Sequence, residues 1–524
     1  MLVAGVDSST QSTKVLLCDA ADGTVVGRGS APHPGGTECD PAAWWAALLQ
    51  AGAGLLDRAA AVGVAGQQHG MIVLDHDGRV IRPALLWNDL RSAGAAAELV
   101  GELGGASWWA QTTGSVPTAS FTVTKLRWLA EHEPANAQRV ASVLLPHDWL
   151  TWRLAGGGPV TYRGIVTGGR TAGAGPLTGG GLVAGGGPMA GGGPVAGGGL
   201  VAGGGLVAGG GLVAGGGPVT DRGDASGTGY FSPVTGEWLP DVAAAALGHR
   251  VQLPRVASPG EAVGTAPPGG PVLSAGTVIS AGTGDNMAAA LGLGLGAGDV
   301  VISIGTSGTA FAVSEGPAAD PSGAVAGFAD ATGRFLPLVC TVNAALVLDA
   351  AAAMLGTDNE GLSGLALTAE PGAGGLTLLP YLDGERTPDR PGATGVLRGL
   401  TTRNATRQNL ARAAVEAVLA SLADAAGLLA ASGIEQRRVL LIGGGARSEA
   451  VCRIAPGIFG APVLVPEPEE YVALGAARQA AWALAGTSQP PAWPRRPASA
   501  YSGPPEPQVR ERHAALREDT AGWS

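Results

Sequence analysis

Short apolar runs interrupted by small polar residues predict strands and tight turns in two separate parts of the chain. Residues 2–19 read LVAGVDSSTQSTKVLLCD, which predicts a strand, a turn of small hydroxyl residues and a second strand. Residues 300–304 also predict a strand, and Gly305 to Gly308 form the expected turn before another apolar run. The two segments therefore predict hairpins of the same design.

Two further apolar runs end in glycine-rich turns that lead into helices. Residues 439–450 read VLLIGGGARSEA, which predicts a buried strand, a glycine cluster and a helix start. Residues 276–294, GTVISAGTGDNMAAALGLG, predict a strand, a glycine turn and an alanine-rich helix that begins at Asp285. The backbone can approach a flat or anionic ligand closely at such glycines, although glycine-rich turns also serve packing alone.

A glycine-rich repeat interrupts this varied pattern. Between Leu177 and Pro218 the unit LVAGGG recurs with few changes, and no charged residue occurs from Thr171 to Thr220. Glycine fills about half of the segment, so little side-chain burial is available to offset the entropy of ordering it. We expect a disordered coil. A solenoid is the alternative, but the unit lacks the bulky stacked side chains of such coils.

The flanks of the repeat carry a duplicated junction. GGGPVTYRG begins at Gly156, and GGGPVTDRG begins at Gly215. Joining LTWRLAGGGPVT directly to DRGDASGTGYF restores a continuous helix end, turn and strand. We therefore interpret residues 156–214 as an expansion within a loop and the second copy, with Asp221 and Asp224, as the original structural segment. Such an expansion costs little closure entropy, because that cost rises only logarithmically with length.

Length and composition narrow the class of protein. The chain has 524 residues, of which 45% are hydrophobic, enough for two or more domains. The net charge of -10 argues against a nucleic-acid partner, because phosphate binding needs a concentrated basic face. The 4 cysteines are widely spaced and indicate neither a disulfide framework nor a zinc site. With no signal-peptide pattern and no apolar stretch of about 18 residues, a cytoplasmic protein without membrane contact is expected.

The first predicted hairpin supplies candidate phosphate-binding groups. Its turn places the Asp7 carboxylate at a strand end beside backbone N–H groups and the hydroxyls of Ser9 and Thr10. Asp7 and Lys14 can there contact a metal ion and phosphate oxygens, although a plain β-hairpin is the alternative. Lysine occurs only at Lys14 and Lys125 in the chain, which draws attention to both. No GxxxxGK[ST] motif is present, so a P-loop enzyme is unsupported.

Asp285 has two interpretations. An aspartate at a helix start is most often a cap. Its neighbour Asn286, together with the second predicted turn about twenty residues further on, instead favours an anion-binding site.

Seven motifs occur in an order that resembles the FGGY carbohydrate kinases. They are residues 7–14, AGQQHG at 65–70, LWND at 86–89, AGTGDN at 281–286, SIGTSG at 303–308, LPYLDGERTP at 379–388 and IGGGARSE at 442–449. The resemblance implies an α/β fold in which two ribonuclease H-like, actin-like ATPase domains flank a catalytic cleft. It implies a sugar-binding domain at 1–297, a nucleotide-binding domain at 298–486 and a proline-rich tail at 487–524. The tail is expected to be extended except for a short helix at 509–519.

The resemblance also implies a role for each motif. Asp285 resembles the general base that takes the proton of the attacking sugar hydroxyl, and Asp7 resembles the carboxylate that positions Mg²⁺. Gln68 and His69 match a sugar-contact pair, and Asn286 is a further expected contact. ATP is expected to contact three loops: Ser9, Thr10 and Lys14; Gly305, Thr306 and Ser307; and Gly443, Gly444, Gly445, Ala446 and Arg447.

Two of these assignments keep alternatives. A lone histidine such as His69 is more often a structural hydrogen-bonding residue, and its motif is what favours sugar contact. The carboxylates of DGERTP, residues 383–388, can belong to a solvated turn or to an interdomain contact.

The expected activity is ATP-dependent phosphorylation of D-xylulose at its 5-hydroxyl, because within that family the motifs most resemble those of members that act on this sugar. Phosphoryl transfer mainly needs alignment of hydroxyl and phosphate and neutralisation of charge, which loop amides and Mg²⁺ can supply. Another acceptor (ribulose, gluconate or glycerol) is an alternative, as is a non-catalytic nucleotide-binding protein of the same fold. An enzyme inactivated by the insertion is a third. The expected partners are a sugar and ATP, with a homodimer left open.

Overall fold

The computed structural model describes residues 1–158 and 217–523. The glycine-rich repeat and the first copy of the junction beyond Gly158 lie outside these residues, so their predicted disorder stays a prediction. The second copy of the junction is described from Gly217 onward, where β9 (Val219–Asp221) and α7 (Arg222–Ala225) form. The strand expected directly after the turn is therefore interrupted by a short helix.

A first seven-stranded sheet is built from strands between Leu2 and Gly284. Its strands are β1 (Leu2–Ser8), β2 (Ser12–Asp19), β3 (Val25–Pro32), β5 (Ala61–Gly66), β13 (Ala262–Thr265), β14 (Val278–Ser280) and β15 (Thr283–Gly284). The order is β13-β14-β5-β1-β2-β3, and β15 also pairs with β5. Strands β1, β5 and β14 are parallel, whereas β2, β3 and the edge strand β13 are antiparallel to their neighbours. The predicted hairpin at 2–19 is confirmed, with Asp7 opposite Lys14.

A second seven-stranded sheet is built from strands between Asp299 and Tyr501. Its strands are β16 (Asp299–Ile304), β17 (Gly308–Ala312), β18 (Ala326–Ala329), β19 (Phe335–Thr341), β22 (Arg438–Ile442), β23 (Val463–Pro466) and β24 (Ala498–Tyr501). The order is β18-β19-β17-β16-β22-β23-β24. Here β16, β22 and β23 are parallel, and β17, β19 and the edge strand β24 are antiparallel to their neighbours. The predicted hairpin after residue 300 is confirmed.

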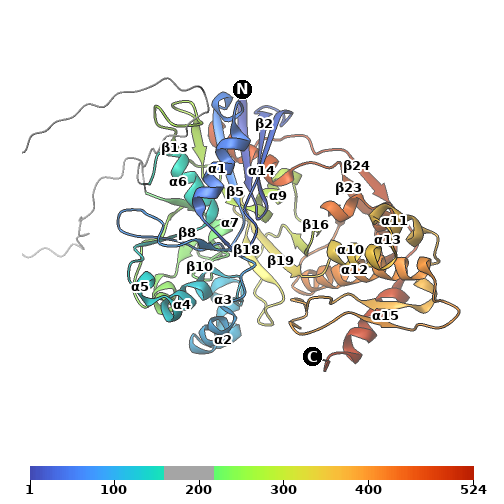
Figure 1. Ribbon diagram of the computed structural model, residues 1–524. Coiled ribbons are helices and arrows are strands. Elements are labelled where there is room, and N and C mark those ends of the chain that lie inside the picture. The colour runs from blue at the N-terminus through green and yellow to red at the C-terminus, as the bar shows by residue number, and fades with distance from the viewer. Residues whose placement is uncertain (159–216, 524) are drawn as a thin grey trace, which may run out of the picture. The chain divides into compact units, whose positions relative to one another are not determined.

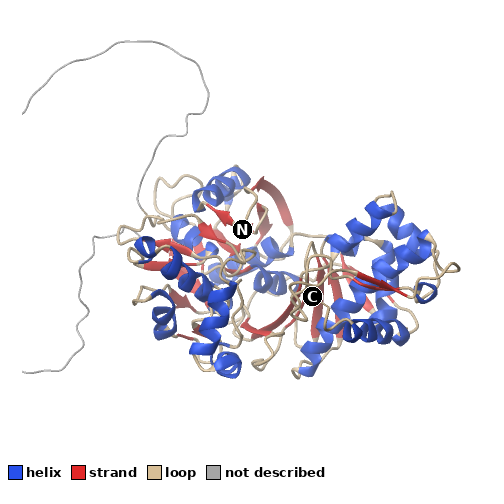
Figure 2. Cartoon of the chain, turned by 60° about the horizontal axis from the view of Figure 1, so that its bottom comes forward, coloured by secondary structure: helices blue, strands red, loops and turns tan. Residues whose placement is uncertain are grey.

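The remaining elements cover these sheets and form small two-stranded pairs (Figures 1 and 2). The short strands are β4 (Glu38–Cys39), β6 (Ile72–Leu74), β7 (Ala84–Leu85), β8 (Ser142–Leu144), β10 (Phe231–Ser232), β11 (Glu237–Trp238), β12 (Arg255–Ala257), β20 (Thr377–Leu379) and β21 (Val396–Arg398). The helices are α1 (Pro41–Gly52), α2 (Ala93–Glu102), α3 (Gly105–Thr113), α4 (Thr122–His132), α5 (Pro134–Ala137), α6 (Pro146–Leu154), α8 (Pro240–Leu247), α9 (Asp285–Leu293), α10 (Ala345–Met354), α11 (Asn359–Leu367), α12 (Arg407–Ala431), α13 (Glu449–Phe459), α14 (Tyr471–Ala485) and α15 (Pro507–Asp519). Three short 3-10 helices, η1 (Leu56–Arg58), η2 (Ala373–Gly375) and η3 (Gly444–Arg447), complete the set.

Helices α9 and α14 pack against each other, and α14 also covers β1 and β5 of the first sheet (Figure 1). Glycines allow this close approach. A Cβ atom on Gly475 of α14 would lie 1.8 Å from the carbonyl oxygen of Ala288 in α9, and one on Gly5 of β1 would lie 1.9 Å from the carbonyl oxygen of Ala473. The first sheet is therefore completed by a helix that follows the second sheet's β23 in sequence.

The segment after Gly486 is part of this packing. Trp493 donates its indole N–H to the carbonyl of Ala20, 3.0 Å away, and β24 closes the edge of the second sheet beside β23. The predicted short helix at 509–519 is confirmed as α15, which packs against α12 and β20. The domain boundaries at 297 and 486 stay predictions.

Within the described ranges, α12 is the one helix long and apolar enough to cross a membrane, with a hydropathy of 1.7 in its most apolar window. That window is 78% buried, with contacts to β17 and β19 of the second sheet. Glu416 and Asp424 interrupt the apolar residues of α12, so this helix does not contradict the expectation that no uninterrupted apolar stretch of about 18 residues is present.

Candidate active site

Asp7 is the last residue but one of β1, a strand that is buried from Val3 to Ser8. Its side chain is only 3% exposed, and burial raises its pKa to about 6 against the lowering effects of Ser9 and Lys14. Ser9 donates its hydroxyl to Asp7, and Lys14 forms an ion pair of 2.6 Å with Glu470 at the start of α14. Thr10 accepts a hydrogen bond from the Trp87 indole at 2.8 Å. The turn thus joins a buried carboxylate to the half-buried Ser9 and Thr10.

Asp285 is the first residue of α9, and Gly284 occupies the N-cap position. The side chain is half-buried, and its Oδ1 accepts hydrogen bonds from the backbone N–H and the side-chain amide of Asn286 at 2.8 and 2.9 Å. Burial, together with the charges of Asp7 and Asp224, raises the pKa of Asp285 to about 7. A carboxylate with a pKa near neutrality, still open on one side, has the properties that a general base needs.

Gln68 and His69 follow β5 and reach the same region. The side-chain amide of Asn286 donates to Gln68 Oε1 at 3.0 Å, so the sugar-contact residues predicted from two distant motifs are brought together. The Nε2 group of Gln68 is buried and has no partner among the described residues. It is therefore a donor available to a bound molecule.

The imidazole of His69 is held by one hydrogen bond and by contacts with two aromatic rings. Its Nδ1 lies 2.6 Å from the carbonyl oxygen of Gly227, and its ring centroid lies 4.7 Å from that of Phe121 and 5.7 Å from that of Phe328 in β18. Burial lowers its pKa to about 3, so the ring is neutral. Because a carbonyl only accepts, Nδ1 carries the proton and Nε2 presents a lone pair, which can accept from a hydroxyl group.

A buried charge cluster that the sequence interpretation did not assign lies in the first domain. His147 at the start of α6 places Nδ1 2.6 Å from Asp224 and Nε2 3.1 Å from Asp148, and all three side chains are at most 1% exposed. Asp221 caps α7 through two backbone N–H groups and accepts from Thr283 at 2.7 Å. Burial lowers the pKa of His147, but the three carboxylates outweigh it and raise that pKa to about 9.

This cluster gives a structural reason for the aspartates in the second copy of the junction. Its two aspartates, Asp221 and Asp224, are among the residues that differ from the first copy, which has Tyr162 and Ile165 at the corresponding positions. The first copy lies outside the described residues, whereas Asp221 and Asp224 are built into the first domain beside Asp285. The duplication was therefore the one sequence signal that could have pointed to the cluster.

The two predicted nucleotide loops lie side by side at the carboxyl ends of β16 and β22, two neighbouring strands of the second sheet. Ser303 of β16 is paired with Ile442 of β22, so Gly305 to Ser307 and Gly443 to Arg447 leave neighbouring parallel strands on the same side. A Cβ atom on Gly445 would lie 2.3 Å from Cγ2 of Ile304. The glycine loop is therefore packed against the hairpin, while Thr306 and Gly444 remain exposed.

The two carboxylates of the DGERTP segment differ, because Asp383 is exposed, as expected for a solvated turn, whereas Glu385 is buried. Glu385 is only 2% exposed and accepts hydrogen bonds from the backbone N–H of Val342 at 2.6 Å and the side chain of Asn343 at 3.0 Å. It is a buried anchor within the second domain. Its neighbour Arg386 contributes to the electrostatics of His69, so this segment does approach the sugar-contact residues.

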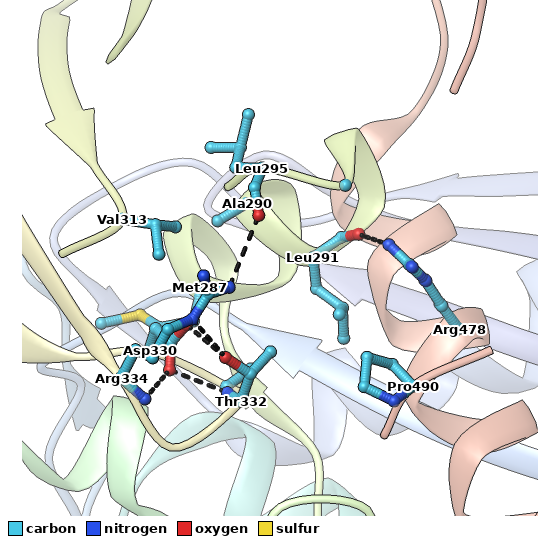
Figure 3. A pocket seen from close by; sticks show the side chains of 12 residues that line it. Met287, Ala290, Leu291, Leu295, Val313, Asp330, Thr332, Arg334, Arg478 and Pro490 are labelled. Atoms are coloured by element: carbon cyan, nitrogen blue, oxygen red, sulfur yellow. Dashed lines mark hydrogen bonds and ion pairs between the residues drawn. The ribbon is translucent and has the colours of Figure 1, made fainter. Parts of the chain in front are cut away.

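A cavity of about 170 Å³ behind α9 is a rival location for ligand binding (Figure 3). Its lining residues include Met287, Leu291, Asp330, Arg334 and Arg478, and none of the predicted site residues. The two arginines already donate to backbone carbonyls, as Arg478 does to Leu291 at 2.9 Å. The cavity's carboxylate, Asp330, already accepts a hydrogen bond from Thr332 and lies 3.7 Å from Arg334, and the cavity contains neither of the predicted phosphate loops.

Two family models match the chain. The N-terminal domain of the FGGY family of carbohydrate kinases matches residues 2–166, and the C-terminal domain of the same family matches residues 300–484. The chain therefore belongs to the FGGY family of carbohydrate kinases. The predictions of the family, of an enzyme and of its two-domain α/β fold are confirmed.

Individual relatives are consistent with this family. The chain is 46% identical to a xylulose kinase of Streptomyces coelicolor over 93% of this chain and 88% of that protein, and 44% identical to a xylulose kinase of Streptomyces rubiginosus over the same shares. Among solved structures, the xylulose kinase from Bifidobacterium adolescentis superposes with a TM-score of 0.82 at 42% identity, with 99% of both chains covered.

Proposed function

We propose that this carbohydrate kinase transfers the γ-phosphoryl group of ATP to the 5-hydroxyl of D-xylulose. The observation that carries the proposal is the group formed by Asp285, Asn286, Gln68 and His69, in which a half-buried carboxylate of raised pKa adjoins an unpaired amide donor and an imidazole acceptor. The names of relatives that are 42 to 46% identical support D-xylulose as the acceptor.

In the proposed reaction, Asp285 accepts the proton of the sugar hydroxyl. The hydroxyl oxygen then bonds to the γ-phosphorus, the bond from that phosphorus to the β,γ-bridging oxygen breaks, and ADP leaves with that oxygen. Its raised pKa makes Asp285 a stronger base than an ordinary aspartate, and half-burial leaves it accessible. Gln68 Nε2 and His69 Nε2 orient the sugar by donating to one hydroxyl and accepting from another.

The second sheet supports the nucleotide in this proposal. Backbone N–H groups of residues 305–307 and 443–445 lie at one sheet edge, where glycine lets the main chain approach phosphate oxygens closely. Ser9, Thr10 and Lys14 are proposed to complete the phosphate site from the first sheet.

The residues fit a divalent cation held with the help of substrate. No cluster of three or more ligating side chains occurs among the described residues, but Asp7 is a buried carboxylate whose charge acts on Asp285. Mg²⁺ is commonly bound through one or two carboxylates together with substrate phosphates. Asp7 would hold it, and the ion supplies neutralisation of phosphate charge when bound.

The remaining features of the proposal concern the protein's surroundings. All 4 cysteines of the sequence are free, which supports a reducing, cytoplasmic compartment. The acidic net charge of -10 supports the absence of a nucleic-acid partner. A homodimer stays a prediction that light scattering on the purified chain would test.

The test is ADP release by the full-length chain with Mg²⁺-ATP and D-xylulose, alongside ribulose, gluconate and glycerol. We expect turnover that strongly prefers D-xylulose, because a site with unpaired polar groups discriminates between hydroxyl arrangements. Turnover with another acceptor only would replace the substrate, and ATP binding without turnover on any sugar would favour a non-catalytic protein.

A further inference from the structure

Lys125 is fully buried in the first turn of α4, and its Nζ donates to the carbonyl oxygens of two residues, His69 at 2.9 Å and Ser120. Among the described residues, no carboxylate lies within ion-pair distance of it. Burial lowers its pKa to about 7. An unpaired ammonium without exposure is costly to bury, and a cation in the first turn also opposes the helix dipole.

The same helix turn contacts His69 in two further ways. The hydroxyl of Thr122 donates to the His69 carbonyl at 3.2 Å, and the ring of Phe121 packs against the imidazole. His69 itself has a φ of 65°, in the left-handed region that non-glycine residues rarely adopt. Hydrogen bonds to its carbonyl therefore hold a conformation that the local sequence disfavours.

We propose that Lys125 is a positioning residue for the sugar site, whose amino group fixes the His69 backbone so that imidazole Nε2 faces a sugar hydroxyl. In this proposal the Gly227 carbonyl holds the protonated nitrogen of His69, and the rings of Phe121 and Phe328 hold the plane of the imidazole. Lys125 holds the main chain that carries the ring. The proposal rests on the proposed function for the identity of the sugar, but its geometry does not depend on turnover.

The rival explanation is that Lys125 only satisfies two buried carbonyls. Under either explanation, removing Lys125 lowers the free energy of unfolding, so a stability measurement alone does not distinguish the two roles. A positioning role also predicts that sugar binding weakens while nucleotide binding does not, because His69 and the nucleotide loops lie on different sheets. It predicts further that the electronic environment of the His69 ring changes.

The first experiment is steady-state kinetics of Lys125→Met, which keeps an apolar stem and removes the donors. We expect KM for D-xylulose to rise about tenfold or more, since a misplaced hydrogen-bond partner loses most of its contribution. KM for ATP and sugar-independent ATP hydrolysis should stay within about twofold, and kcat should fall much less than kcat/KM does.

The matched control is Ser92→Ala. Ser92 is also fully buried, and its hydroxyl donates to the carbonyl of Ala119 at 3.0 Å and lies 3.1 Å from Thr124 of the same helix, without touching His69. It should cost stability but leave KM for D-xylulose unchanged. Equal sugar KM values for Lys125→Met and wild type, or an equal rise in both variants, would overturn the proposal.

A second readout works without turnover. In ¹⁵N-histidine-labelled protein, with His69 assigned through His69→Gln, wild type should show a neutral ring protonated at Nδ1. Lys125→Met should shift the His69 nitrogens and Ser92→Ala should not. If no sugar is phosphorylated, the proposed function fails on its own, while an unchanged His69 signal overturns the positioning role separately.

Should Lys125→Met fail to fold, Thr122→Val removes the weaker donor to the same carbonyl. It should raise KM for D-xylulose about threefold, in keeping with one hydrogen bond of moderate length. An unchanged KM in that variant would contradict the idea that donors to the His69 carbonyl position the ring.

Discussion

The two large sheets share most of their strand order but differ in chemistry. In each, a hairpin leads into antiparallel strands on one side, two parallel strands follow on the other, and an antiparallel edge strand closes the sheet. Strand β1 corresponds to β16, β5 to β22, β14 to β23 and β13 to β24. By this correspondence the tail strand β24 is an integral edge of the second sheet.

The difference lies in the residues that follow equivalent strands. The β1 end carries Asp7 opposite Lys14, whereas the equivalent position of β16 carries Ser303 opposite Thr309. After β14 the chain enters α9 with Asp285, and after β23 it enters α14 with Tyr471. One backbone plan therefore presents charged side chains in the first sheet and mainly neutral main chain in the second, which suits a proton acceptor in one half and phosphate binding in the other.

The largest expected effect is that of Asp285→Asn, which removes the proposed base and leaves its two hydrogen bonds possible. We expect kcat to fall about 10²- to 10⁴-fold, the range typical of a general base. The control is Tyr471→Phe at the equivalent start of α14, whose hydroxyl donates only to the Glu467 carbonyl at 2.6 Å. If Asp285→Asn retains activity close to that of Tyr471→Phe, the proposed difference in chemistry between the two sheets is contradicted.

The next effect concerns the packing between the two equivalent helices. Gly475→Ala would place a methyl group 1.8 Å from the Ala288 carbonyl, so we expect a loss of about 1–3 kcal/mol of unfolding free energy or more. Gly364→Ala in α11, where a Cβ meets nothing within 4 Å, should instead be neutral or stabilising. Chemical denaturation of both variants gives the measurement, and equal stabilities would show that α9 and α14 can separate freely.

A smaller effect is expected in the glycine loop of the second sheet. Gly445→Ala forces a methyl group against Ile304, at 2.3 Å from its Cγ2, and should displace the loop from the hairpin. We expect KM for ATP to rise about tenfold, equal to about 1.4 kcal/mol of binding, with KM for D-xylulose unchanged. Steady-state kinetics with each substrate varied in turn measures both KM values. A rise in KM for D-xylulose alone would contradict the assignment of nucleotide binding to the second sheet.

The pH dependence tests the charged half directly. Asp285 must be deprotonated to accept a proton, and its pKa is raised to about 7, so kcat should fall as the pH decreases through about 7. Asp224→Asn removes one of the two negative charges that raise this pKa, so the acid limb should move to lower pH. A pH–kcat profile with the same midpoint in both proteins would show that another group limits the rate.

The smallest expected effect is that of excising residues 156–214. All predicted site residues lie within the described ranges, and the second junction copy supplies Asp221 and Asp224. We therefore expect unchanged kinetics and melting temperature. A gain in activity on excision would show instead that the repeat inhibits the enzyme.

The local pattern was sufficient for the elements that make the site. Short apolar runs on either side of small-residue turns predicted both hairpins, the glycine runs predicted the loops after β14 and β22, and Asp285 was expected where α9 begins. These features depend on hydrogen bonds and periodicities between residues near in sequence. Seven motifs in order then indicated the family, because each is a short stretch that can be recognised without knowledge of the tertiary structure.

Only the tertiary structure decided how charge is buried. Lys125 meets His69 across 56 residues, His147 meets Asp224 across 77, and Asn286 meets Gln68 across 218. The sequence left the environment of Glu385 open, and the structure shows it as a buried anchor, while the proline-rich tail supplies an edge strand. The sequence by itself thus determined the loops and the class of chemistry. The pKa values and the orientation of His69 depend on desolvation and on partners distant along the chain, which no local pattern encodes.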